Sequence, residues 1–143
     1  MIRSFRALIP VLAAVCPLGA GPQGGPGYMD PQTAVFNTLS TACSSGSGCA
    51  ATSVASFTLA SGNALCSVSV TGTFSATIAF DYSLDGINWS SAYVTPNTGS
   101  AATSTTSAFF GSITMNGVTF FRARASSYAS GSPYIGIYCV PNP

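Results

Sequence analysis

Very few side chains in this sequence could take part in acid–base, nucleophilic or metal-assisted chemistry. The 143 residues include no His, Lys or Glu, and only four Arg and three Asp are charged. General acid–base catalysis needs a group that titrates near the working pH, and a Ser or Cys nucleophile needs an adjacent base. Catalytic zinc needs His or Cys ligands around an open position. The composition therefore predicts a protein that is not an enzyme and has no cofactor or metal. The charged residues are Asp30, Asp81, Asp85, Arg3, Arg6, Arg122 and Arg124.

The same few charges limit the partners. Asp81 and Asp85 could form a paired-carboxylate site in principle, but their spacing places them on opposite sides of a turn. Only Arg122 and Arg124 are basic beyond the first six residues, too few to neutralise a row of nucleic-acid phosphates. A surface rich in Ser, Thr and Ala with almost no charge does little to resist self-association. We therefore expect protein neighbours, including further copies of this chain, and no nucleic acid.

The cysteines predict a disulfide framework. Without the first 20 residues, four remain, Cys43, Cys49, Cys66 and Cys139, and an even number allows complete pairing. Cys43 and Cys49 flank a short Ser/Gly loop that closes easily, whereas Cys66 and Cys139 fall on the first and last predicted strands of the core. We predict the pairings Cys43–Cys49 and Cys66–Cys139, which indicate an oxidising compartment or oxidation after release. The alternative is four reduced, buried cysteines that act as small apolar side chains.

Trp89 and Tyr93 are candidates for contact with a ligand. Trp89 follows an Asp85-Gly86 turn, in which Asp85 can accept hydrogen bonds from turn amides and Gly86 can supply a positive φ. In one interpretation Trp89 folds over this turn as a structural cap. In the other, an exposed Trp89 beside Tyr93 stacks on a sugar ring, which makes a glycan a possible partner.

Arg122 and Arg124 are candidates for contact with a neighbouring protein. They alternate with Phe121, Ala123 and Ala125, so the apolar residues should point inward and both arginines outward. On an exposed outer face, one of them could pair with Asp81. The functional alternative is an interface in which the arginines bind carboxylates or carbonyls of a neighbour.

The chain divides into three segments. Residues 1–20 combine a basic start, an apolar stretch and a small-residue end, which predicts a secretory signal peptide or, alternatively, an apolar docking arm. Residues 21–53 are rich in Gly, Pro and Ser and should form a linker with the small cysteine loop. Residues 54–143 should form a β-sandwich. No apolar run reaches the roughly 18–20 residues that span a membrane.

Alternating apolar residues predict strands from about residue 54 onward, and no later window shows helical periodicity. Asn116-Gly117 predicts a hairpin with a returning strand over 119–126. The sequence therefore predicts an all-β antiparallel sandwich, jelly-roll-like, with six to eight strands and an irregular N-terminal extension. In the strand over 76–84, the residues predicted to face the core are Ala76, Ile78, Phe80, Tyr82 and Leu84.

Residues 66–138 also carry a family resemblance. Its pieces are VSVTGTFS at 68–75, FDYSLDGINW at 80–89, NGVTFFRARA at 116–125 and SYASGS at 127–132. In order and spacing they resemble the β-sandwich domain of bacteriophage virion and tail-associated structural proteins. The resemblance implies a structural or receptor-facing part of a particle, without catalysis.

Two functions follow from these observations. The first is a non-enzymatic structural protein of a phage-like virion, either a capsid decoration or a tail-associated component. The second, favoured by the leader and the even cysteine number, is a secreted bacterial surface or matrix sandwich that binds carbohydrate. The expected location is the virion surface or the extracellular space.

Overall fold

The computed structural model of the chain describes residues 34–43, 49–59 and 63–141. The predicted leader or arm at 1–20 therefore lies outside the described residues, as do parts of the predicted linker at 21–33 and 44–48. The described residues form two antiparallel sheets and one short 3-10 helix, η1 (Ala51–Ser53). None of these residues belongs to a helix long and apolar enough to cross a membrane.

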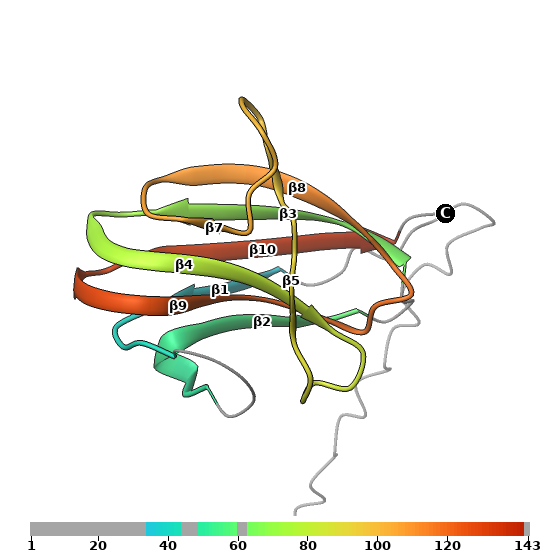
Figure 1. Cartoon of the computed structure of the whole chain (residues 1–143), viewed down its shortest axis with the longest axis horizontal. Coiled ribbons are helices and arrows are strands. Elements are labelled where there is room, and N and C mark those ends of the chain that lie inside the picture. Colours follow the sequence, from blue (N-terminus) through green and yellow to red (C-terminus); the bar gives the residue numbers. More distant parts are fainter. Residues whose placement is uncertain (1–33, 44–48, 60–62, 142–143) are drawn as a thin grey trace, which may run out of the picture.

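One sheet, called sheet A here, has the strand order β1-β10-β3-β8-β6 (Figure 1). Its central strands are β10 (Tyr134–Pro141), β3 (Asn63–Thr71) and β8 (Phe109–Asn116). Its edges are β1 (Val35–Thr38) and the two-residue β6 (Thr95–Pro96). Successive residues of a strand point to opposite faces of a sheet, so every second residue of β3 and β10 lies in the core.

The other sheet, called sheet B here, has the order β2-β9-β4-β5, and β7 also pairs with β4. The long antiparallel pair β4 (Phe74–Ser83) and β9 (Phe120–Gly131) forms its centre. The shorter members are β2 (Val54–Thr58), β5 (Ser90–Ser91) and β7 (Ser104–Thr105). Sheets A and B together form the all-β sandwich that the sequence predicts. It has ten strands rather than the expected six to eight, because β5, β6 and β7 contain only two residues each.

The core lies between the two sheets. Apolar side chains from the inner faces of both sheets are almost completely buried, because sheet-on-sheet packing removes one face of each strand from water. Burying such a side chain stabilises the fold by about 1.5–3 kcal/mol relative to leaving it exposed. The largest fully buried side chains are Phe80, Phe121, Leu39, Ile78, Ile135, Ile137, Val68, Val70 and Val94.

The sandwich begins earlier in the chain than the sequence predicts. Val35–Thr38 lie in the segment expected to be linker, yet they pair with Ile137–Tyr134 and form an edge of sheet A. This strand has four residues, too short for its alternation to stand out from the surrounding Gly, Pro and Ser residues.

The predicted hairpin at Asn116-Gly117 is wrong, although the turn itself is present. Gly117 has a φ of 65°, but β8 belongs to sheet A and β9 to sheet B, so the turn carries the chain between the sheets. The turn at Gly72 crosses in the same way, since β3 and β4 lie in different sheets. A Cβ atom on Gly72 would lie 2.5 Å from the carbonyl oxygen of Ser132, so only glycine fits this crossing. Local turn signals therefore do not reveal which strand becomes the neighbour.

Candidate interaction surfaces

An ion-pair cluster lies on the outer face of sheet B. Asp81 on β4 is directly opposite Arg122 on β9, with Arg124 two residues further along the strand. A single carboxylate oxygen, Oδ2 of Asp81, accepts hydrogen bonds from Nε of Arg122 at 3.0 Å and Nε of Arg124 at 2.6 Å. The sequence suggests one partner for Asp81, whereas the structure gives it both arginines.

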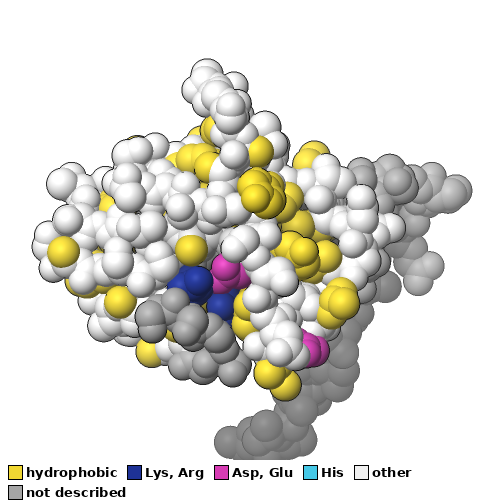
Figure 2. Space-filling model, in the orientation of Figure 1, with side chains coloured by type: hydrophobic (Ala, Val, Ile, Leu, Met, Phe, Trp, Pro, Cys, Tyr) yellow, Lys and Arg dark blue, Asp and Glu magenta, His cyan; other side chains and the backbone are white. Residues whose placement is uncertain are grey.

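The prediction that the arginines are exposed is wrong. They do point away from the core, but only 3% of the Arg122 side chain and 13% of the Arg124 side chain are accessible. The Cys43–Cys49 disulfide lies beside them: Nη1 of Arg124 donates to the carbonyl of Cys43 at 2.7 Å, and Nη1 of Arg122 lies 3.7 Å from Sγ of Cys49. Figure 2 shows this group of basic and acidic atoms near the centre of the face. Burial lowers the pKa of Arg122, and the hydrogen bond and charge of Asp81 oppose that shift.

Trp89 covers the cluster from another side. The guanidinium carbon of Arg122 lies 3.8 Å from the centroid of the Trp89 ring, which is a cation–π contact. The indole Nε1–H donates to the carbonyl of Gly86 at 3.0 Å, so Trp89 also closes the turn before it. Of the two interpretations of Trp89, this geometry is that of the structural cap.

The Asp85 turn satisfies its own polar groups. Oδ1 of Asp85 accepts from the backbone N–H groups of Ile87 at 2.8 Å and Asn88 at 2.7 Å, and Oδ2 accepts from the Asn88 side chain at 2.6 Å. The backbone hydrogen bonds from Asn88 and Ile87 hold the pKa of Asp85 well below its ordinary value. The hydroxyl of Ser83 binds the same carboxylate, so the chain turns away from the core before Leu84. Leu84, predicted to face the core, is 65% exposed for this reason.

Tyr93 lies apart from the Trp89–Arg122 contact. Its side chain is 68% exposed and borders a hollow of about 460 Å³, in which Tyr82 and Met115 also take part but Trp89 does not. Trp89 packs on Arg122 and bonds to Gly86, so a sugar platform formed by Trp89 beside Tyr93 stays a prediction. What remains is a hollow with two tyrosines, hydroxyl and amide groups and an apolar floor. It is lined by Tyr82, Ser91, Ala92, Tyr93, Ile113, Thr114, Met115, Asn116 and Val118.

The cysteines pair as the spacing predicts. Cys66 on β3 and Cys139 on β10 are directly opposite each other in sheet A, and both are fully buried. Cys43 and Cys49 form the second bridge, next to sheet B. The Cys66–Cys139 disulfide thus joins two central strands of sheet A, β3 and β10. The Cys43–Cys49 disulfide lies over the ion-pair cluster on the outer face of sheet B.

The outer face of sheet A is a surface that was not predicted from the sequence. Within the described residues, all four charged side chains belong to β4, β9 or the Asp85 turn, so sheet A has none. Five of the eight exposed large hydrophobic residues of the described chain lie on this face instead. They are Phe36 on β1, Leu65 on β3, Phe110 on β8, and Tyr134 and Tyr138 on β10.

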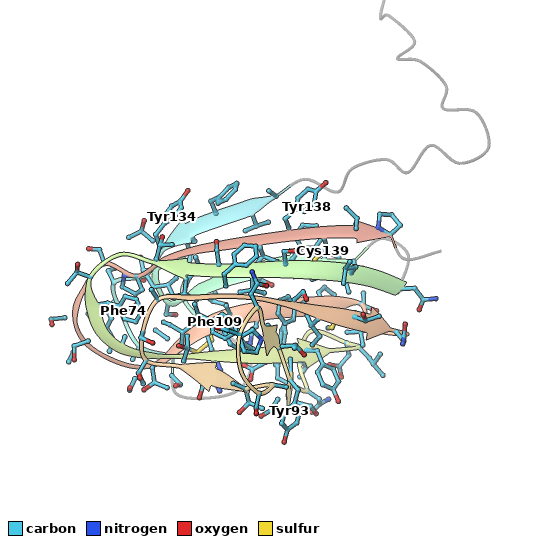
Figure 3. The ribbon with its side chains drawn as sticks, turned by 90° about the horizontal axis from the view of Figure 1, so that it is seen from above. Phe74, Tyr93, Phe109, Tyr134, Tyr138 and Cys139 are labelled. Atoms are coloured by element: carbon cyan, nitrogen blue, oxygen red, sulfur yellow. A yellow bond between two sulfur atoms is a disulfide. The ribbon has the colours of Figure 1, made fainter. Side chains whose placement is uncertain are left out.

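The alternation of inward and outward residues along β10 does indicate part of this surface. Once Ile135, Ile137 and Cys139 face inward, Tyr134 and Tyr138 must face outward (Figure 3). Phe36 gave no such signal, because β1 itself was not predicted. Within the described ranges, no three His, Cys, Asp or Glu side chains gather as metal ligands would.

A solved structure supports the fold. The chain is similar to the crystal structure of the SPBc2 prophage-derived protein YomS, with a TM-score of 0.55 over 77% of this chain and 95% of that chain. The sequence identity is 17%, so the likeness concerns the fold alone. The sequence matches no protein-family model and no curated protein.

Proposed function

We propose that this chain is a non-enzymatic structural protein of a phage-like particle, which acts through contacts with protein neighbours. The observation that carries the proposal is the uncharged outer face of sheet A, with its exposed Phe36, Phe110, Tyr134 and Tyr138. The centres of protein interfaces are depleted in charged residues and enriched in aromatic ones. An exposed cluster of large apolar side chains on a small domain commonly marks a contact surface.

The arrangement of the charges supports the same function. Asp81 neutralises part of the charge of Arg122 and Arg124 within the molecule, beneath Trp89 and beside the Cys43–Cys49 bridge. Side chains engaged in this way leave few charges for an external ligand. The similarity to a prophage-derived protein fits a particle of phage type, either as a capsid decoration or as a tail-associated component.

Purified particles provide the direct test. Particles sedimented from a lysate of the cells that encode this chain should contain it in a fixed ratio to the major particle protein. Because Arg122 and Arg124 are the only tryptic sites beyond residue 6, digestion with chymotrypsin followed by mass spectrometry is the suitable readout. Recovery only in the medium or cell envelope, with none in the particles, would contradict the proposal.

A second candidate function is a secreted domain that binds a neutral carbohydrate. The two disulfides favour an oxidising location, and the hollow between Tyr82 and Tyr93 offers aromatic, hydroxyl and amide groups without charge. Its volume lies within the range of about 300–1,000 Å³ that is typical of ligand pockets. A glycan array separates the two functions: binding by the wild type that is lost in Tyr93→Ala would favour the carbohydrate.

A further inference from the structure

We propose that the outer face of sheet A binds the same face of a second copy of this chain. This inference rests on the proposed function. That function depends on protein contacts made by the outer face of sheet A, and the inference names the partner of this face. In a twofold pair one patch faces itself, so each copy must present both a protruding part and a part that receives it.

The register of sheet A supplies both parts in one row. Phe36, Gly136, Ser69 and Phe110 stand side by side on β1, β10, β3 and β8. The row therefore has a large aromatic residue at each end and two small residues between them. Neighbouring strands lie about 4.8 Å apart, so the two aromatic residues stand about 14 Å apart on either side of a low centre.

The rows on either side continue this relief. In one, Tyr138 on β10 is followed across the sheet by Ser67 and Ser112. In the other, Tyr134 stands next to Thr71, and its ring lies parallel to that of Phe36, with 6.0 Å between the ring centroids. The protruding residues thus gather over β1, β10 and β8, and serines line the centre.

Gly136 keeps the centre low. A Cβ atom at this position would lie 2.7 Å from Oγ of Ser69 and 3.0 Å from a ring carbon of Phe36. The groove that remains has a volume of about 80 Å³, far below the roughly 300 Å³ of a small-molecule pocket. It can receive part of a protruding side chain, such as an aromatic ring of a facing copy. The groove is lined by Phe36, Ser67, Ser69, Phe110, Gly136, Ile137 and Tyr138.

Charge favours the same partner. Within the described residues, Asp81, Asp85, Arg122 and Arg124 all belong to the other sheet or its turn. Two copies that meet through sheet A bury no ion and bring no like charges together, so the pairing avoids the penalty for removing a charge from water. A charged partner would lose the hydration of its ions against this face without gaining an opposite charge.

The size of the face predicts a weak dimer. Eight residues of β10, β3 or β8 extend about 27 Å, the four-residue β1 extends about half as far, and four strands are about 19 Å wide, so the face covers about 450–500 Å². Two facing copies bury about 1,000 Å² in total, at the lower limit of a specific interface. We expect a dissociation constant on the order of 10–100 µM, which repetition in a particle would strengthen.

Sedimentation analysis of the purified full chain, from about 1 µM to about 1 mM, tests the inference around the expected dissociation constant. The wild type should convert from monomer to dimer across this range. Phe110→Arg and Tyr138→Arg each place a charge on the face, and each should raise the dissociation constant at least about tenfold. Tyr93→Arg is the matched control, because it adds the same charge at a residue that is more exposed than Phe110 or Tyr138 and lies on the side of the molecule opposite Tyr134 and Tyr138 (Figure 3). The control should dimerise like the wild type. Unchanged thermal unfolding of each variant shows that it is folded.

The outcomes separate this inference from the proposed function. A wild type that stays monomeric up to about 1 mM, or a Tyr93→Arg variant that weakens the dimer as much as Phe110→Arg, overturns the inference. A monomeric wild type whose Tyr138 ring signals shift in NMR with a neutral oligosaccharide also overturns it and assigns the face to sugar. If the chain is found in particles but never dimerises, the function stands and the inference fails. If it dimerises through sheet A but is absent from particles, the reverse holds.

Discussion

The two outer faces of the sandwich differ in their residues and in how far the rest of the chain covers them. Sheet B carries Asp81, Arg122 and Arg124 on its outer face, and Trp89 and the Cys43–Cys49 bridge cover them. Sheet A carries no charge among its described residues and leaves its aromatic side chains uncovered. The charged residues on the outer face of sheet B, which could bind a ligand or a partner, are thus engaged in contacts within the chain.

Residue type alone therefore does not identify an interaction surface. Arginine and tryptophan are common at interfaces, yet here Arg122 is buried and the half-buried Trp89 ring packs on its guanidinium group. Tyr134 and Tyr138 look like ordinary strand residues, yet they remain accessible beside Gly136 and Ser69. Coverage by other parts of the chain decides which face is free.

The largest expected effect is the loss in free energy of unfolding when a disulfide is removed, and it should differ between the two disulfides. Replacing Cys66 and Cys139 together by Ala opens a loop of 73 residues and should lower the free energy of unfolding by about 4 kcal/mol in the chain-entropy account. Replacing Cys43 and Cys49 by Ala opens a loop of six residues and should lower it by about 2 kcal/mol. Urea unfolding followed by circular dichroism measures both losses.

Intact mass is the control for this comparison. The wild type should gain about 4 mass units on reduction, two for each bridge, and each double variant about 2. No gain would mean that the four cysteines are reduced, which is the alternative left open by the sequence. Equal losses in the two double variants would show that loop length does not govern their contributions.

The next effect concerns the cover of sheet B. Asp81→Ala removes the carboxylate that both Arg122 and Arg124 bind, which leaves two largely buried cations without their shared partner. Breaking a buried ion pair in this way typically lowers the free energy of unfolding by about 3 kcal/mol or more. Urea unfolding at neutral pH measures the loss.

Asp85→Ala is the matched control, since it removes the same charge from an exposed turn and should have a smaller effect. A triple variant, Asp81→Leu with Arg122→Met and Arg124→Met, tests the comparison further. Because it removes all three charges, it should recover most of the stability lost in Asp81→Ala. A loss below about 0.5 kcal/mol in Asp81→Ala would show that the cluster is solvated rather than covered.

A smaller effect is expected at Trp89. Trp89→Phe keeps an aromatic ring but loses the hydrogen bond to Gly86 and weakens the contact with Arg122, so the free energy of unfolding should fall by about 1 kcal/mol. Tyr93→Ala, at an exposed aromatic residue, should change the free energy of unfolding very little. Because Trp89 is the single tryptophan, its fluorescence in Asp81→Ala also reports on the cluster. Equal losses in Trp89→Phe and Tyr93→Ala would argue against the cap.

The elements predicted best from the sequence are those whose alternation is long. The strands around Val68, Phe80, Phe121 and Ile137 all place their apolar residues inward as expected, because one buried face fixes the phase of a strand. Leu84 fails at the end of this pattern, where the hydrogen bond between Ser83 and Asp85 turns the chain away. Residues 1–33 lie outside the described chain, so the choice between leader and docking arm stays a prediction.

The candidate site could be predicted only in part, for a different physical reason. Alternation gives the face on which Arg122 and Arg124 lie, but not what covers that face. Part of their cover comes from Cys43 and Cys49, which are more than 70 residues away in the sequence. The row of Phe36, Gly136, Ser69 and Phe110 likewise depends on strand order, because four separate strands contribute to it. Pairing between distant strands is not encoded in any single local pattern.

The smallest expected effect concerns Asp85, which lies in the exposed turn beside the outer face of sheet B. Its pKa is held below the ordinary value by backbone hydrogen bonds from Asn88 and Ile87, so the charged form is favoured in the folded state. The unfolded carboxyl has a pKa of about 3.9, so this contribution to stability is fully present above about pH 5. It is lost as the pH falls below about 4 toward the lower folded pKa. The difference in free energy of unfolding between wild type and Asp85→Asn should therefore be constant near neutral pH and shrink in acid.

Carbon-detected NMR titration of the Asp85 carboxyl measures the folded pKa directly. Asn88→Ala removes the side-chain donor to Oδ2 but keeps both backbone donors to Oδ1, so the pKa of Asp85 should rise only part of the way. An ordinary pKa in the wild type, or a full return to it in Asn88→Ala, would show that the backbone amides do not hold the carboxylate. The turn that carries Trp89 would then be loosely organised, and the cover over Arg122 would have to depend on the Cys43–Cys49 bridge instead.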